Sequence, residues 1–204
     1  MAEPKVPVIN GAGYDFQTPP EALLPLYEFL PKDWVIWECA AGKGNLVKAL
    51  TERGYKVIST DLRTGNDFLM YEPNEHYDCI ITNPPYDLKD EFFHRAYLLG
   101  KPFAFLVPLT SFEGKLRQSL FSKFGLEVVM FDKRINFEVP EEEGGQTVVD
   151  ASADYNEIEA GKKPAKKANG SWFMTAWFSN GLKMGKQLTF VSYMGKNKGR
   201  SSES

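Results

Sequence analysis

The chain has 204 residues, of which 43% are hydrophobic and 25% charged, so we expect one soluble globular domain spanning residues 1–204. No apolar run is long enough to cross a membrane, the N-terminus lacks signal-peptide character, and a net charge of −3 argues against non-specific coating of nucleic acid. Two separated cysteines, Cys39 and Cys79, and two histidines are too few for a zinc site or a histidine triad. We therefore expect no metal and predict reduced, buried cysteines.

The first two-thirds of the chain alternates strand-like and helix-like segments. The predicted strands cover 34–38, 55–60, 78–82, 103–107 and 127–131, and the predicted helices cover 45–54, 89–99 and 115–124. Alternation at this spacing implies right-handed crossovers, and hence a parallel sheet with helices on both faces. Ligands of such sheets bind beyond the carboxyl ends of the strands. The loops after Glu38, Thr60, Thr82 and Val107 are therefore expected to share one edge and to hold the site.

The pattern changes after residue 137. Residues 141–160 contain seven acids and no Lys or Arg, whereas residues 161–204 contain nine Lys or Arg and one acid. A solvated acidic loop with a basic tail and a cationic patch that contacts phosphates both stay open as interpretations. Residues 138–170 lack an apolar period and are predicted to form a long exposed loop, and residues 195–204 a disordered tail. Residues 171–178 are strongly strand-like, and a strand arriving after so long an excursion can be antiparallel to the others.

The segment from Glu38 to Gly44 (ECAAGKG) follows the first predicted strand and precedes the first helix. Glycines here let the backbone approach a ligand closely, although a tight structural turn has the same composition. A phosphate-binding P-loop is not indicated, because Asn45 follows Gly44 where that loop has its hydroxyl-bearing ending. Asp61, at the end of the next strand, is placed to accept both hydroxyls of a ribose or, alternatively, to cap a turn.

The most specific feature is Asn83-Pro84-Pro85-Tyr86, directly after a buried strand. The prolines remove N–H donors and restrict the backbone, which leaves carbonyl acceptors beside the Asn83 side-chain oxygen, and Tyr86 adds a ring that can stack. This set suits a planar group with an NH2, such as adenine, whose amino lone pair is delocalised into the ring. Acceptors on both hydrogens favour pyramidalisation and expose the lone pair to a sulfonium methyl group. An ordinary loop is the alternative interpretation.

These motifs occur in one order along the chain: Asp15-Phe16-Gln17-Thr18-Pro19-Pro20, ECAAGKG, Asp61, Asn66-Asp67-Phe68, NPPY and Arg134-Ile135-Asn136-Phe137. The order resembles the amino-group DNA methyltransferases, especially the N6-adenine enzymes of phages and restriction systems, over residues 14–137 and the strand near 172–178. The resemblance implies a Rossmann-like class I methyltransferase fold: α/β, with a mostly parallel seven-stranded sheet, an antiparallel last strand and helices on both faces. It also implies S-adenosyl-L-methionine as cofactor, DNA as partner, base flipping, direct in-line methyl transfer, and a cytoplasmic location (the host cytoplasm if phage-encoded).

The resemblance assigns roles residue by residue. Catalysis is assigned to Asn83, Pro84, Pro85 and Tyr86, and cofactor binding to Thr18, Pro19, Glu38, Ala40, Gly42, Gly44, Asp61, Asp67 and Phe68. Cys39 stands where the family usually has proline, and the glycines are intact. Tyr86 and Phe137 are expected to stack on the flipped base, with core packing as the alternative for Phe137.

One departure from the family bears on specificity. Its sequence-specific members usually carry a separate target-recognition domain, for which this chain has no room. Residues 138–170 are the candidate replacement, with Lys162, Lys163, Lys166 and Lys167 available for phosphates, so we expect loose or short sequence specificity. The alternatives left open are adenine methylation of RNA, cytosine amino methylation, protein glutamine methylation, and a non-catalytic nucleic-acid-binding subunit. The sequence does not determine the oligomeric state.

Overall fold

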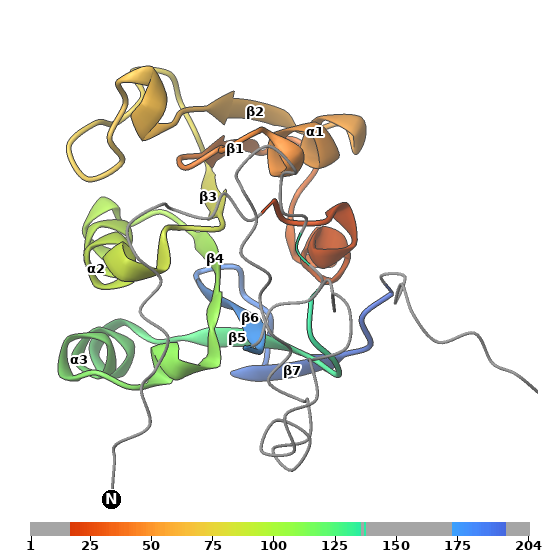
Figure 1. Cartoon of the computed structure of the whole chain (residues 1–204), viewed down its shortest axis with the longest axis vertical. Helices are drawn as coiled ribbons and strands as arrows, with labels where there is room; N and C mark the ends of the chain where they lie inside the picture. The colour runs from red at the N-terminus through yellow and green to blue at the C-terminus, as the bar shows by residue number, and fades with distance from the viewer. Residues whose placement is uncertain (1–16, 136, 138–172, 195–204) are drawn as a thin grey trace, which may run out of the picture.

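One sheet runs through the structure, with helices on both of its faces (Figure 1). A computed structural model of the chain describes residues 17–135, 137 and 173–194. The predicted 138–170 loop with its four lysines and the predicted 195–204 tail lie outside these residues.

Within the described residues the sheet contains β1 (Val35–Glu38), β2 (Lys56–Ser59), β3 (Cys79–Thr82), β4 (Phe103–Pro108), β5 (Glu127–Phe131), β6 (Thr175–Asn180) and β7 (Leu188–Val191). The α-helices are α1 (Asn45–Glu52), α2 (Lys89–Leu99) and α3 (Lys115–Phe124). The 3-10 helices are η1 (Pro20–Phe29), η2 (Leu62–Thr64), η3 (Tyr86–Leu88) and η4 (Leu109–Phe112). Every strand and helix predicted from the sequence is confirmed to within a few residues. None of the helices in these ranges has the length and apolar character needed to cross a membrane.

The strand order is β2-β1-β3-β4-β6-β5-β7, and β6 is antiparallel to both of its neighbours, whereas the other neighbouring pairs are parallel. The expected mostly parallel seven-stranded sheet is therefore confirmed, and the antiparallel strand is the one predicted near 172–178. One detail differs, because the short strand β7 follows β6 in the chain and pairs in parallel with β5. Two backbone N–H groups of the β6–β7 connection, those of Leu182 and Met184, donate to the Glu127 carboxylate at 3.1 and 2.6 Å and hold the connection against β5.

The hydrophobic core is divided by the sheet into two clusters, as expected for strands buried on both faces. Cys79 and Ile81 of β3 belong to the cluster under α1 and η1, whereas Ile80 between them belongs to the cluster under α2 and α3. This alternation follows from the two-residue period of a strand. Figure 1 shows α2 and α3 on one side of the sheet and α1 on the other. Cys39 and Cys79 are both buried, which confirms the prediction of their burial, and neither forms a disulfide.

The segment η1 was not predicted as a helix. Pro25 lies inside η1 and has no N–H to donate, so the helical hydrogen bond at this position is missing. The indole Nε1–H of Trp177 on β6 donates to the Ala22 carbonyl at 2.7 Å. This buried bond ties η1 to the sheet across 155 residues of chain.

The start of η1 lies near the carboxyl edge of the sheet. η1 ends shortly before β1 begins, so its first residues point toward the far end of β1. Burial, with a smaller contribution from the Glu21 carboxylate, raises the pKa of Tyr193 to about 12, and Tyr193 lies just beyond the carboxyl end of β7. The Glu21 carboxylate is therefore near enough to Tyr193 to act on it electrostatically.

Candidate functional site

The residues singled out in the sequence follow the ends of parallel strands at one edge of the sheet. β1 ends at Glu38, Asp61 lies two residues beyond β2, and Asn83 directly follows β3. Because β6 runs in the opposite direction, its first residue, Thr175, lies at the same edge, beside Pro108 of β4. The predicted shared edge is therefore confirmed, and the start of β6 is added to it.

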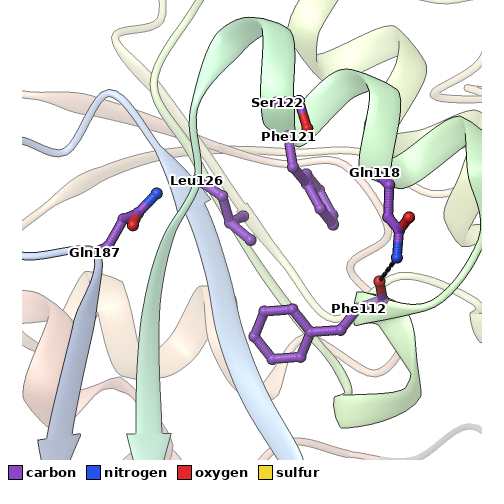
Figure 2. A pocket seen from close by; sticks show the side chains of 6 residues that line it. All are labelled: Phe112, Gln118, Phe121, Ser122, Leu126 and Gln187. Carbon is purple, nitrogen blue, oxygen red and sulfur yellow. Dashed lines mark hydrogen bonds between the residues drawn. The ribbon is translucent and has the colours of Figure 1, made fainter.

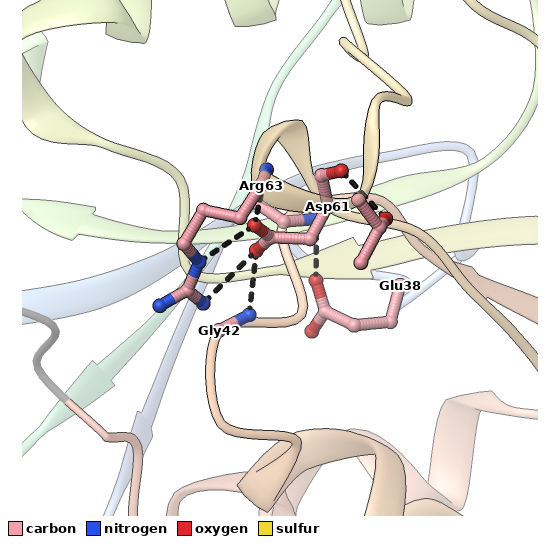
Figure 3. A network of polar contacts seen from close by, with 6 residues as sticks. Glu38, Gly42, Asp61 and Arg63 are labelled. Carbon is pink, nitrogen blue, oxygen red and sulfur yellow. Dashed lines mark hydrogen bonds and ion pairs between the residues drawn. The ribbon is translucent and has the colours of Figure 1, made fainter.

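The Asp61 carboxylate links the loop after β2 to the glycine segment (Figure 3). Its Oδ2 accepts the Gly42 N–H at 2.8 Å, and its Oδ1 accepts the Arg63 N–H at 2.9 Å and the Arg63 Nε–H at 2.8 Å. Partial burial by itself would raise the Asp61 pKa, but the hydrogen bonds from Arg63 and Gly42 outweigh it, and the pKa lies below its usual value. Asp61 thus caps η2 and remains ionised beside the glycine segment.

The glycine segment needs its glycines for backbone conformation. Gly42 and Gly44 have φ values of 57° and 87°, in the left-handed region that costs other residues about 1–2 kcal/mol. The Gly44 N–H donates to the Ala41 carbonyl at 2.8 Å, and the Ala41 N–H donates to the Thr60 carbonyl at 3.0 Å. The loops after β1 and β2 are therefore joined by backbone hydrogen bonds, and Gly44 leads directly into α1.

Glu38 is a completely buried acid at the centre of this edge. Burial raises its pKa from the ordinary value to about 8, and the opposing contributions of the nearby Thr82 hydroxyl and the Ala40 N–H are smaller. Its Oε1 accepts the Ala40 N–H at 3.0 Å, whereas Oε2 and the Thr82 hydroxyl do not meet in a hydrogen bond of normal geometry. The carboxyl group is therefore largely protonated at neutral pH in the protein without ligands.

The buried Glu38 makes stability depend on pH. Its folded pKa of about 8 is raised, so the folded state binds more protons than the unfolded state between roughly pH 4.5 and 8, and the free energy of unfolding should fall as pH rises through that window. We expect Glu38→Gln to remove this slope and to stabilise the fold at pH 7 by on the order of 3 kcal/mol. Urea unfolding at pH 5, 6, 7 and 8 measures both effects.

The control for this prediction is Glu75→Gln, which changes an exposed acid and should leave the slope unchanged. A wild-type stability that does not change between pH 5 and 8, together with a Glu38→Gln variant no more stable than wild type, would show that the carboxyl group is ionised in the fold.

The NPPY segment forms the turn between β3 and α2. Asn83 is half-buried, Pro84 is buried, and Tyr86 begins η3, which leads into α2. The Lys89 ammonium donates to the Tyr86 carbonyl at 2.9 Å. Burial raises the pKa of the Tyr86 hydroxyl far above its usual value, so this group stays protonated. The turn thus presents the side chains of Asn83 and Tyr86 at the edge already occupied by Glu38 and Asp61.

Phe173 is a site residue that the sequence did not single out. Its ring lies against that of Tyr86, with 5.5 Å between ring centroids and an interplanar angle of 81°. Phe173 comes just before β6, and the Leu109 N–H at the end of β4 donates to the Met174 carbonyl at 3.0 Å, which fixes this stretch beside β4. The aromatic-rich run 171–178 is visible in the sequence, but no local pattern indicates that Phe173 contacts Tyr86.

Arg117 connects the helix that follows the NPPY turn to the loop after β4. Its side chain is almost buried, it forms an ion pair with Asp90 in the first turn of α2, and its Nε–H donates to the Ser111 carbonyl at 2.9 Å. Gly114, with φ 105°, leaves space for it, since a Cβ there would lie 2.6 Å from Arg117 Nη2. We refer to Arg117, Asp90 and Ser111 as the Arg117 clamp.

Several buried side-chain oxygens near this edge lack a hydrogen-bond partner within the residues that the structure describes. They are Thr18 Oγ1, Glu38 Oε2, Thr82 Oγ1, Tyr86 OH, Ser111 Oγ and Thr175 Oγ1. Buried polar atoms are ordinarily paired, so a concentration of such oxygens indicates an edge built for a polar ligand. A ligand with hydroxyl and amino groups fits this set and the ionised Asp61. No three His, Cys, Asp or Glu side chains among the described residues are grouped to hold a metal ion.

The structure shows the surroundings of three residues with assigned roles, and for Phe137 it favours the core-packing alternative. Phe137 is 4% exposed and packs in the cluster under α1 and η1, so its ring belongs to the core and not to an open surface. Phe68 is 2% exposed, and its ring lies 4.6 Å from that of Phe92, within the other cluster. Asp67 accepts the Leu69 N–H at 2.9 Å and so stabilises the turn after η2.

Comparison with known proteins identifies the fold. No protein-family model matches the chain, and no curated protein matches it in sequence. A proposed class I S-adenosylmethionine-dependent methyltransferase from Listeria monocytogenes superimposes with a TM-score of 0.50 at 13% identity, covering 91% of this chain and 68% of that protein. The chain has the class I methyltransferase fold.

Two further solved structures resemble the chain. A predicted O-methyltransferase from Agrobacterium tumefaciens has a TM-score of 0.49 at 14% identity, with 85% of each chain covered. A type I restriction-modification system methyltransferase subunit from Streptococcus thermophilus also has a TM-score of 0.49 at 14% identity, covering 92% of this chain and 50% of that one. The chain thus spans half the length of that subunit. In the class I methyltransferase fold of this protein, the edge with Glu38, Asp61 and Asn83 is the carboxyl edge of the parallel strands.

Proposed function

We propose that this chain is an S-adenosylmethionine-dependent methyltransferase that methylates the N6 amino group of adenine in DNA. The observation that carries the proposal is the position of the NPPY turn, directly after β3 and at the same edge as Glu38, which ends the neighbouring strand β1, and Asp61, which follows β2. A single edge then offers acceptors for an amino group and acids for a nucleoside cofactor.

The proposed cofactor contacts follow from the chemistry of the donor set. Asp61 would accept the ribose hydroxyls after releasing Arg63, and its low pKa keeps it ionised for this purpose. Glu38, Thr18 and the glycine segment would surround the methionine end, and Asp67 the adenine end, with Phe68 packed behind. When bound, S-adenosylmethionine supplies an electrophilic methyl group on a positively charged sulfur.

The proposed role of the NPPY turn is to bind and orient the amino group. The Asn83 side-chain oxygen and the Pro84 carbonyl accept its two hydrogens, which draws the lone pair out of conjugation with the ring. Tyr86 stacks on the base, and Phe173 packs against the Tyr86 ring and limits its movement. Adenine in a duplex must be extruded to reach these groups. Lys162, Lys163, Lys166 and Lys167 are proposed to contact phosphates, with loose sequence specificity.

The test of this function is nucleoside mass spectrometry on DNA and RNA from methylation-deficient cells that express the chain. N6-methyladenine in the DNA supports the proposal. N6-methyladenine in RNA alone would support the proposed chemistry of the site and show that the substrate is RNA and not DNA. If neither polymer changes, the proposed function is wrong.

The Arg117 clamp is predicted to matter for turnover more than for cofactor binding. Arg117→Met removes the ion pair to Asp90 and the bond to Ser111, so α2 and the NPPY turn before it lose one of their attachments. Small misplacements of catalytic groups cost up to about 10²-fold in rate, and we expect kcat to fall about tenfold. The dissociation constant of S-adenosylmethionine should stay within about twofold of wild type, because the clamp does not touch Glu38 or Asp61.

Steady-state kinetics on an adenine-containing oligonucleotide and titration calorimetry with the cofactor measure these two quantities. Lys115→Met, which removes an exposed charge from the same helix, is the matched control, and Arg117→Lys should recover part of the rate. A loss of thermal stability with unchanged kcat would limit the clamp to a structural role.

A further inference from the structure

The strand β7 forms an edge of the sheet that carries exposed apolar side chains. Within the described residues β7 pairs with β5 and has no strand on its other side, at the end of the sheet opposite β2 (Figure 1). Phe190 on β7 is 76% exposed and Met194, just beyond it, is 73% exposed. Because Phe190 is the register partner of Met130, which packs with the cluster under α2 and α3, its ring lies on the α3 side of the sheet. Large exposed apolar groups gathered in one place indicate an interaction surface.

A shallow pocket of about 460 Å³ continues this face toward the start of β7. It is lined by Phe112, Gln118, Phe121, Ser122, Leu126 and Gln187, which come from η4, α3 and the segments entering β5 and β7 (Figure 2). The lining has no charged side chain, so the pocket does not indicate the chemistry of a partner. That indication comes from the charges around β7.

Four cationic side chains flank β7. Lys133 and Arg134 follow β5 at the carboxyl edge, and Lys183 and Lys186 lie in the connection that enters β7 at its amino end, toward the opposite edge of the sheet. None of the four forms an ion pair within the part of the chain that the structure describes. Residues 181–194 contain no acid, although the whole chain has a net charge of −3.

Two acids on β5 and directly after it, Glu127 and Asp132, accept hydrogen bonds from the backbone around β7. Asp132 accepts the Tyr193 N–H at 2.8 Å, and this bond, as the largest contribution, lowers its pKa. Glu127 accepts the N–H groups of Leu182 and Met184. Both carboxylates therefore stabilise the connection and the end of β7, and the four cations outnumber these two acids.

The position of β7 suits a contact with the flank of a substrate. β5 and β7 are parallel to β3 and β4, so their carboxyl ends lie at the edge that holds the NPPY turn. Four strand spacings separate β3 from β7 in the sheet, which at about 4.8 Å each is about 19 Å. A duplex that lay along this edge with its target base at Asn83 would reach β7 after about five or six base pairs, at about 3.4 Å per base pair.

We propose that Lys133, Arg134, Lys183, Lys186, Phe190 and Met194, here called the β7 surface, bind the nucleic acid that flanks the target base. The proposal rests on the proposed function for its choice of a nucleic acid, and cations beside an exposed aromatic ring fit phosphates and an unstacked base. Pairing of β7 with β7 of a second copy of the chain would bring four cations against four cations, so electrostatic repulsion disfavours a second copy as the partner.

Binding of fluorescein-labelled duplex DNA of about 20 base pairs, of its single strand and of the matching RNA tests this surface across a salt series. We expect Lys133→Ala/Arg134→Ala and Lys183→Ala/Lys186→Ala each to weaken binding about tenfold and to lower the slope of log affinity against log salt by about 1–2. Phe190→Ala should weaken binding at least about fivefold, most strongly for single strands.

The matched controls are Lys48→Ala/Lys56→Ala, on α1 and β2 at the other end of the sheet, and Leu98→Ala, an exposed apolar residue on α2. They should leave affinity and slope unchanged. If the β7 variants bind nucleic acid as tightly as wild type, and wild type methylates DNA, the β7 surface is not a binding surface and the proposed function still stands. If the β7 variants bind nucleic acid more weakly but wild type methylates neither DNA nor RNA, the β7 surface binds nucleic acid and the proposed function is wrong. A dimer that Phe190→Ala dissociates, with nucleic-acid binding unchanged, would make this face a protein interface and overturn the proposal.

Discussion

Replacing Asn83 with alanine should lower kcat for methyl transfer to adenine by about 10²- to 10³-fold. The substitution removes one of two acceptors for the amino hydrogens, and loss of one fixed dipole aimed at developing charge has about this effect in other enzymes. The fold should persist, because Asn83 is half-buried and follows β3 without being part of it. Cofactor affinity should change by no more than about twofold, since the proposed cofactor contacts come from Thr18, from β1 and from the loops after β1 and β2.

Quenched-flow measurement of methyl transfer to a short adenine-containing oligonucleotide, with N6-methyladenine as the product counted, isolates this effect from product release. Asn74→Ala is the matched control, because Asn74 is exposed in a loop away from the strand ends. Asn83→Asp keeps a side-chain acceptor oxygen at this position and should recover part of the rate. Wild-type kcat in Asn83→Ala would show that the NPPY turn is an ordinary loop.

Replacing Asp61 with alanine should raise the dissociation constant of S-adenosylmethionine about 100-fold or more. Hydrogen bonds to an ionised group contribute about 1.5–3 kcal/mol each, and two ribose hydroxyls donating to one carboxylate together exceed the roughly 2.7 kcal/mol that a 100-fold change requires. The ion pair with Arg63, whose side chain is more than half exposed, competes for the same oxygens. Arg63→Ala should therefore tighten binding by up to about fivefold.

Titration calorimetry gives both dissociation constants, and thermal unfolding reports whether Asp61→Ala still folds after losing the bond from the Gly42 N–H. Asp61→Asn, which keeps the shape of the side chain, separates the loss of charge from the loss of that bond. Asp33→Ala, an exposed acid before β1, is the control. Equal cofactor affinity in wild type and Asp61→Ala would show that Asp61 does not bind the cofactor and serves only as the cap of η2.

The position of the candidate site was readable from local sequence patterns. Buried strands such as 103–107 are continuous apolar runs, the helices between them end near glycine, and parallel strands place their carboxyl ends together. Glu38 is the last residue of β1, and Asp61 and Asn83 lie two residues and one residue beyond their strands, so their common edge follows once the strands are assigned. Short-range preferences were sufficient for this part, because each of them acts within a few residues of chain.

The sequence by itself determined the alternating α/β order, the shared edge and the chemistry of its side chains. Only the tertiary structure decided that β6 enters between β4 and β5, that Phe137 packs in the core, and that Phe173 meets Tyr86 across 86 intervening residues. It also decided that the Arg63 side chain donates a hydrogen bond to the Asp61 carboxylate and that the four-residue strand β7 pairs with β5. These features depend on which distant segment supplies a strand partner or a packing surface. A local pattern specifies what a segment can form, whereas burial and pairing across the sheet determine which partner it meets.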